Sequence, residues 1–133
     1  MLFTIQPDSP VPIFEQIVTQ TLFAIARGDL AVGSLIPSVR ELAGRLVVHP
    51  NTVARAYQEL ERKAVVESQR GKGMKVTQEA PSIARAQRRD IVRCRIREAL
   101  REAVSSALSA EEVHALVEEE WGQLTESAST PEV

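Results

Sequence analysis

Residues 49–62, HPNTVARAYQELER, constrain the fold more than any other stretch of the chain. Apolar side chains recur there every three or four positions, the spacing that places them on one face of a helix, and they are Val53, Ala56, Tyr57 and Leu60. The opposite face carries Asn51, Arg55, Gln58, Glu59 and Arg62. Pro50 suits a first helical turn, because its fixed φ matches a helix and its missing N–H needs no partner there. The pattern predicts a helix that packs by one face and offers a polar face that fits the major groove of B-DNA.

A second short helix is predicted immediately before it, over residues 37–46. Ser38 is followed three residues later by Glu41, which is the capping-box spacing that starts a helix. Its apolar stripe consists of Val39, Leu42, Ala43 and Leu46. Only residues 47–49 separate the two helices. Two helices joined by so short a turn form a helix-turn-helix, in which the second helix reads bases and the first crosses the DNA backbone.

A β-hairpin is predicted after the helix pair. Residues 65–69 and 74–77 are short β-prone runs, and the basic, glycine-rich sequence RGKG at residues 70–73 separates them. A hairpin in this position is a wing. Arg70 and Lys72 at its tip would meet phosphate oxygens or enter a minor groove, and Gly71 and Gly73 would let the backbone approach closely. The spacing does not fit a nucleotide phosphate loop, which needs GxxxxGK followed by Ser or Thr.

The charge of the chain divides into two parts. The formal net charge is −2, but nine Lys or Arg and five acids between Arg27 and Lys75 give +4. From Glu79 onward, seven Arg and eleven acids give −4. The positive part coincides with the helix pair and the wing, which favours nucleic-acid binding by that part of the chain.

The residues before the helix pair predict packing elements. Apolar residues within 13–27 follow a helical spacing that ends at Gly28, so we expect a core helix. Residues 2–5 suit a short extended segment, and residues 31–36 leave room for a very short strand.

The tail predicts two further helices. An apolar stripe runs from Ile91 to Leu108, and Ser109 followed by Glu112 is a second capping box. A two-helix hairpin cannot bury both apolar stripes by itself, so pairing with a second copy is expected. The dimerisation residues predicted on these stripes are Ile96, Leu100, Val104, Leu108, Val113, Leu116, Val117 and Trp121. The expected division is a DNA-binding domain over residues 1–78, a helical tail over 79–126 and a disordered end over 127–133.

Other classes of function lack their signatures. No nucleophile is paired with a base, so we do not expect an enzyme, and His49 and His114 with the single Cys94 show no metal-ligand spacing. Cys94 is expected to pack on a helix face, and Trp121 to lie in a core or interface rather than a cleft. No window resembles a membrane span or signal peptide, so a soluble cytoplasmic protein without cofactors is predicted.

The motifs resemble, in order and almost without gaps over residues 11–77, the GntR family of bacterial transcription regulators. The matching segments are VPIFEQI at 11–17, LAVGSLIPSVRELA at 30–43, HPNTVARAYQELE at 49–61 and RGKG at 70–73. The short tail points to the YtrA-like branch. The resemblance implies a winged helix-turn-helix that binds a palindromic operator as a dimer. It also implies DNA contacts by Arg40 of the Pro-Ser-x-Arg motif, by His49, Pro50, Asn51 and Thr52, and by the wing glycines Gly71 and Gly73.

Three positions depart from the family pattern. Family members usually have glycine where this chain has Val47 and Ala64, so the turn before the third helix either differs or is strained, and the corner after that helix is in doubt. His49 replaces the usual Asn or Ser before the proline. It either contacts DNA or caps the helix less firmly, and we favour the weaker cap over a pH-sensing histidine.

These observations together predict a mainly α fold with a small β wing, a winged helix-turn-helix followed by a two-helix dimerisation hairpin. The expected function is a homodimeric repressor that binds a double-stranded DNA operator, and the alternative is a protein-interaction adaptor that uses the same fold without DNA. The DNA-binding residues predicted are Ser38, Arg40, His49, Pro50, Asn51, Thr52, Arg55, Arg70, Gly71, Lys72 and Gly73. The tail is too small for the enclosed metabolite pocket of larger family members, and the sequence defines no effector.

Overall fold

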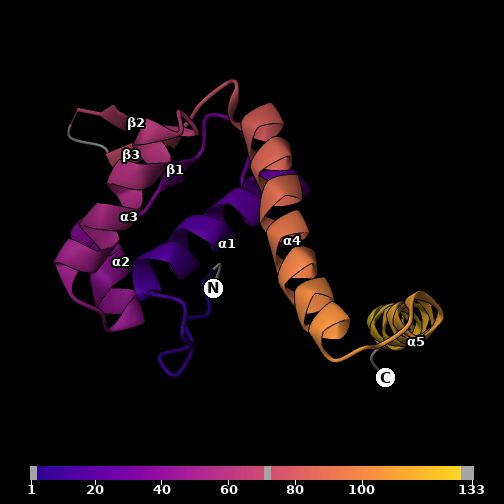
Figure 1. The fold of residues 1–133 in the computed structure, drawn as a ribbon. Helices are drawn as coiled ribbons and strands as arrows, with labels where there is room; N and C mark the ends of the chain where they lie inside the picture. The colour runs from indigo at the N-terminus through magenta and orange to yellow at the C-terminus, as the bar shows by residue number, and fades with distance from the viewer. Residues whose placement is uncertain (1–2, 71–72, 130–133) are drawn as a thin grey trace. The chain divides into compact units, whose positions relative to one another are not determined.

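The computed structural model describes residues 3–70 and 73–129 (Figure 1). Five helices and three strands follow one another in these residues. They are α1 (Ile13–Arg27), β1 (Leu35–Ile36), α2 (Val39–Leu46), α3 (Pro50–Arg62), β2 (Val66–Gln69), β3 (Gly73–Val76), α4 (Ala80–Ser105) and α5 (Ala110–Ser129). The expected fold class, mainly helical with a small β wing, is confirmed.

The chain forms two compact units, Met1–Ile91 and Val92–Val133. Their division falls inside α4, further along the chain than the boundary expected after residue 78. The physical reason is that Ala80 and Ala84 on the first turns of α4 are fully buried in the first unit. Helix α5 also continues through residues 127–129, where disorder was expected. Ser and Ala tolerate a helix end, and the aliphatic and acidic residues before them favour helix.

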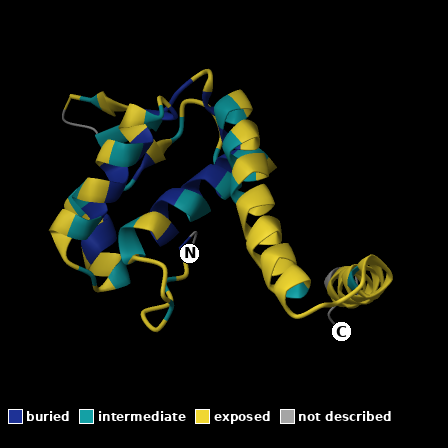
Figure 2. Ribbon diagram, in the orientation of Figure 1, coloured by how far each residue is buried: buried dark blue, intermediate teal, exposed yellow. Residues whose placement is uncertain are grey.

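The core of the first unit lies between α1, α3 and the sheet (Figure 2). Its fully buried side chains include Ile17, Leu22 and Ile25 of α1, Val53 and Leu60 of α3, and Val65, Val66 and Val76 of the wing region. Helix α1 ends at Gly28, which adopts φ 89° and donates its N–H to the carbonyl oxygens of Ala24 and Ile25. The predicted core helix is therefore confirmed.

The sheet is antiparallel, in the order β1-β3-β2. Strand β3 pairs Lys75 with Leu35 of β1 and with Glu67 of β2, so the predicted short strand before α2 holds the hairpin to the helix pair. Two glutamines of α1 hold the N-terminal segment. The side chain of Gln16 hydrogen-bonds the backbone of Gln6, and that of Gln20 hydrogen-bonds the backbone of Thr4, over 2.7–3.0 Å. These hydrogen bonds attach the extended N-terminal segment to α1.

Candidate nucleic-acid interface

The turn between α2 and α3 adopts the backbone conformation that glycine prefers. Val47 lies at φ 55° and ψ 53°, and its side chain is 89% exposed. A β-branched residue in this region crowds its own carbonyl oxygen, and no packing contact offsets the cost. Of the two possibilities raised by the sequence, the strained turn is the one observed. Ala64, after α3, also has a positive φ, of 66°.

The start of α2 presents Arg40 to solvent. The Ser38 side chain accepts a hydrogen bond of 3.2 Å from the Glu41 N–H, as the capping box requires. Glu41 does not return the contact, because its carboxylate binds Arg45 at 2.5 Å instead. Half of the predicted capping box is therefore formed. Within the described residues, the exposed Arg40 guanidinium has no ion pair or hydrogen bond.

The start of α3 is capped by His49. Its Nδ1 atom accepts a hydrogen bond of 3.0 Å from the Asn51 N–H, and Pro50 occupies the first turn as predicted. An imidazole nitrogen accepts only when it is unprotonated, so the cap requires neutral His49 in this tautomer. Asn51 is exposed and Thr52 half-buried, and neither side chain has a hydrogen bond within the described residues. The first turn of α3 thus has an exposed amide and a half-buried hydroxyl without hydrogen-bond partners in the described residues.

The opposite face of α3 is buried as predicted. Val53, Ala56, Tyr57 and Leu60 are each at most 3% exposed. The Tyr57 hydroxyl donates a hydrogen bond of 2.6 Å to the Pro37 carbonyl oxygen, just before α2. Burial, followed by the nearby Glu41 carboxylate, raises the pKa of Tyr57 above its ordinary value. The contact ties the inward face of α3 to the start of α2, which orients the two helix starts.

The wing is a tight two-stranded ladder. Its register runs from Val66 opposite Val76 to Gln69 opposite Gly73. Gly73 has φ 91°, and a Cβ atom there would lie 3.3 Å from the Ile36 carbonyl oxygen, so both backbone conformation and close approach favour glycine. Arg70 is exposed at the end of β2. Gly71 and Lys72, the other predicted tip residues, lie outside the described residues.

Arg55 differs from the other predicted DNA-binding residues in its surroundings. It is exposed, but its Cζ atom lies 3.8 Å from the centroid of the Phe14 ring on α1. A guanidinium over an aromatic face is attracted by the ring quadrupole. The structure therefore brings Arg55 to α1, a contact that helical spacing within residues 49–62 alone does not reveal.

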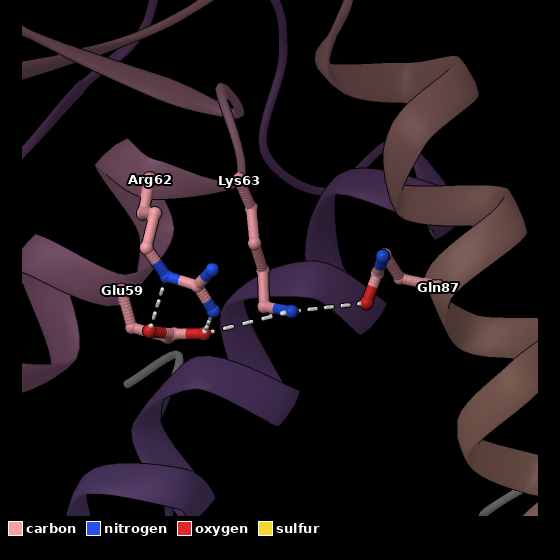
Figure 3. Close-up of polar contacts among 4 residues, drawn as sticks. All are labelled: Glu59, Arg62, Lys63 and Gln87. Carbon is pink, nitrogen blue, oxygen red and sulfur yellow. Dashed lines mark hydrogen bonds and ion pairs between the residues drawn. The ribbon is translucent and has the colours of Figure 1, made fainter.

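A polar network at the end of α3 was missed by the sequence reasoning (Figure 3). Glu59 binds Arg62 through both carboxylate oxygens, and Lys63 lies 3.7 Å from Glu59 Oε1. Lys63 also donates a hydrogen bond of 3.2 Å to Gln87 Oε1 on α4. The hydrogen bond from Arg62 lowers the pKa of Glu59. The i to i+3 and i to i+4 spacings predict the first pairs, but only the tertiary fold brings Gln87 beside them.

The second unit exposes its apolar side chains. Exposed large hydrophobic residues there include Ile96, Leu100, Val104, Leu108, Leu116, Val117 and Trp121, and only Val113 of the predicted dimerisation set is half-buried.

The capping box of α5 is complete, since Ser109 and Glu112 exchange two hydrogen bonds of 3.1 Å. A groove of about 640 Å³ lies between the end of α4 and the start of α5. Cys94 is exposed, so the packing role expected for it is absent from the isolated chain.

The described residues hold neither a metal-binding cluster nor a membrane-spanning helix. In residues 3–70 and 73–129, no three His, Cys, Asp or Glu side chains gather closely enough to hold a metal ion. No helix in the described part of the chain combines the length and apolar composition needed to cross a bilayer.

Comparison with known proteins assigns this chain to a family. The model of the bacterial regulatory proteins of the gntR family matches residues 14–76. The HTH-type transcriptional repressor YtrA of Bacillus subtilis is 31% identical over 118 residues, which cover 89% of this chain and 91% of that protein. The HTH-type transcriptional regulator Rv1152 of Mycobacterium tuberculosis is 51% identical over 57 residues, 43% of this chain and 47% of that one.

Solved structures agree with the sequence relatives. A GntR family transcriptional regulator from Listeria monocytogenes superposes with a TM-score of 0.70 and 31% identity, over 84% of this chain and 97% of that one. YtrA from Sulfolobus acidocaldarius, a GntR-family transcription factor, gives a TM-score of 0.58 and 33% identity, over 75% and 98%. This chain therefore belongs to the GntR family, in its YtrA-like branch, and is a DNA-binding transcription regulator of the winged helix-turn-helix type rather than an enzyme.

Proposed function

We propose that this protein represses transcription in the cytoplasm by binding, as a homodimer, to a palindromic operator. The observation that carries the proposal is which arginines of the helix-turn-helix already have an interaction partner within the chain. Arg45 binds Glu41, Arg55 stacks on Phe14, and Arg62 binds Glu59. Arg40 alone among the arginines of α2 and α3 has no such partner in the described residues. A solvated, unpaired guanidinium beside a helix start is available to DNA without breaking an internal contact.

The proposed base-reading surface consists of the starts of α2 and α3. An arginine bonds guanine O6 and N7 in the major groove, and an asparagine bonds adenine N6 and N7, so Arg40 and Asn51 suit base contacts. Ser38, His49, Pro50 and Thr52 flank them at the same helix starts and suit phosphate or base contacts. The proposed wing contacts are Arg70, Gly71, Lys72 and Gly73.

The homodimer is proposed from the second unit, whose apolar side chains are exposed in a single chain. A symmetric pair would place two α3 helices on two half-sites, and operator palindromy would mirror that symmetry. The repressor assignment is supported by the name of the Bacillus subtilis relative. The proposed dimerisation residues are Ile96, Leu100, Val104, Leu108, Val113, Leu116, Val117 and Trp121.

The first experiment selects duplexes from a random pool with the full chain and sequences the retained fragments. The expected result is a palindrome whose half-sites are about one helical turn apart, or a multiple of it. A DNA-binding protein that contacts about six to ten phosphates should lose roughly three to five decades of DNA affinity between about 50 and 200 mM salt. Failure to retain any duplex at low salt would instead favour a protein-interaction adaptor.

The second experiment compares Arg40→Ala with Arg45→Ala. Both arginines are exposed on α2, but Arg45 is already paired with Glu41. Arg40→Ala should weaken operator binding by about 1–3 kcal/mol if its guanidinium bonds a base edge. Arg45→Ala should change it much less. Equal effects of the two substitutions would remove Arg40 from the proposed surface.

A further inference from the structure

A pocket lies between the start of α2, the middle of α3 and the wing. Its volume is about 360 Å³, and Ser38 of α2, Gln58 of α3 and Gly73 of β3 are among the residues that line it. In Figure 1, α3 runs between α2 and the strands of the wing. Ser38 and Gly73 belong to the proposed DNA-binding surface, so this wing pocket adjoins that surface.

The charge of the wing pocket does not suit a phosphate group. Among the described residues that line it there is one acid, Glu61, and no lysine or arginine. The Glu61 carboxylate accepts a hydrogen bond of 3.0 Å from Ser68 Oγ. A phosphate in the pocket would therefore meet a carboxylate without a cation to offset it. The pocket suits the neutral edge of a base pair better than it suits the DNA backbone.

Gln58 brings an amide to this pocket that no contact within the chain occupies. Its side chain is exposed and has no hydrogen bond within the described residues. Gln58 lies seven residues after Asn51, and helical spacing places the two on the same polar face of α3. Seven residues span about 10 Å along a helix, or about three base-pair steps of 3.4 Å. The two amides are therefore spaced to read different base pairs.

The surface next to Gln58 is apolar. Ala54 lies one turn before Gln58 and also lines the pocket, so the two side chains are neighbours on one helix face. Val39 of α2 and Met74 of the wing, both half-buried, add apolar surface to the same pocket. In the major groove, an A·T pair presents N6 and N7 of adenine together with the methyl group of thymine. An amide beside apolar side chains matches that pattern.

We infer that Gln58 is a specificity-determining residue, which bonds an adenine of the operator while Ala54 contacts the methyl group of an adjacent thymine. The adenine N6–H donates to Gln58 Oε1, and Gln58 Nε2 donates to adenine N7. Guanine offers two acceptors at these positions and cannot satisfy Oε1, so adenine is preferred. This inference rests on the proposed operator binding and adds a base pair to the proposed reading surface.

The first test selects duplexes from a random pool with full-length Gln58→Ala and with the wild-type chain. The wild-type motif should contain an A·T position in each half-site whose preference disappears in Gln58→Ala, while the other positions keep theirs. Affinity for the wild-type operator should fall roughly five- to hundredfold, as expected for loss of a bidentate base contact. Alanine favours helix at an exposed position, and circular dichroism should show wild-type helix content.

Gln78→Ala is the matched control. Gln78 is also an exposed glutamine and follows the wing, but it does not line the pocket. Its substitution should leave the selected motif unchanged and the operator affinity within about twofold of the wild-type value.

Modified operators test the base contacts without altering the protein. 7-Deazaadenine lacks the N7 acceptor, so at the position assigned to Gln58 it should weaken wild-type binding several-fold. The same change should alter the affinity of Gln58→Ala by less than about twofold, because the partner of N7 is already missing. Deoxyuridine lacks the thymine methyl group, and in place of the thymines at and beside that position it should weaken wild-type binding about three- to fourfold.

The opposite results are equally definite. The same motif for Gln58→Ala and the wild type, or equal effects of 7-deazaadenine on both chains at every adenine, would overturn the inference and leave operator binding standing. Full affinity for the deoxyuridine operators would overturn the contact assigned to Ala54. A wild-type chain that retains no duplex at low salt would reject the proposed operator binding itself.

Discussion

The phenolic hydroxyl of Tyr57 donates a hydrogen bond of 2.6 Å to the carbonyl oxygen of Pro37, twenty residues earlier in the chain. Pro37 directly precedes Ser38, the N-cap of α2, while Tyr57 lies in the middle of α3. This part-buried contact therefore ties the start of α2 to α3. The exposed Arg40 and Asn51 depend on this arrangement for their relative position.

The Tyr57→Phe substitution tests that contact. It preserves the ring and leaves the Pro37 carbonyl without its donor, so the free energy of unfolding should fall by about 1–2 kcal/mol. Urea unfolding followed by circular dichroism measures the difference. A decrease smaller than about 0.3 kcal/mol would show that solvent replaces the lost donor at no cost.

The ionisation of Tyr57 should be coupled to unfolding at alkaline pH. Burial raises its pKa in the folded state, so the neutral phenol is the form that the fold stabilises. The contribution is complete below the ordinary tyrosine pKa of about 10 and is lost as pH rises above it. Because the chain has one tyrosine, phenolate absorbance reports this group alone. Ionisation near pH 10 with helix content intact would contradict the prediction.

Val47→Gly should stabilise the protein. The left-handed conformation costs a residue with a Cβ about 1–2 kcal/mol, and glycine removes this cost. Glycine also has more freedom in the unfolded chain, which lowers stability by about 0.5–1 kcal/mol. The expected net gain is about 0.5–1 kcal/mol, since the 89% exposed side chain gives up little packing. Thermal unfolding measures it.

Val32→Gly is the control for this prediction. Val32 is also exposed, at 45%, but it is not among the residues with positive φ. Glycine there should leave the melting temperature unchanged or lower it. A fall in melting temperature for Val47→Gly would mean that the turn is not strained in solution.

Arg55→Met separates packing on α1 from DNA binding. The guanidinium lies 3.8 Å from the Phe14 ring centroid, and its loss should lower the free energy of unfolding by about 0.5–1 kcal/mol. Methionine keeps the aliphatic length over the ring. Operator affinity should fall less than with Arg40→Ala in the same electrophoretic titration. A larger fall in operator affinity for Arg55→Met than for Arg40→Ala would indicate that Arg55 contacts DNA.

The local signals in the sequence predicted the elements that carry the site. The spacing of Val53, Ala56, Tyr57 and Leu60 identified the buried face of α3, and Pro50 identified its start, because both depend on contacts within a few residues. The complete Ser109–Glu112 capping box was predicted for the same reason. Glu41 shows the limit of such reasoning, since an alternative partner, Arg45, lies equally close along the helix.

The sequence by itself therefore determined the helices, the hairpin, the winged helix-turn-helix and the family, since periodicity, caps and turn residues act over short distances along the chain. The tertiary structure decided what those signals leave open: that Val47 takes the left-handed turn, that Arg55 faces Phe14, and that Lys63 meets Gln87. The two side-chain contacts join residues of separate helices, so no local spacing encodes which side chains will meet. The Val47 conformation belongs to the turn that connects α2 to α3, and it follows from how those two helices pack together.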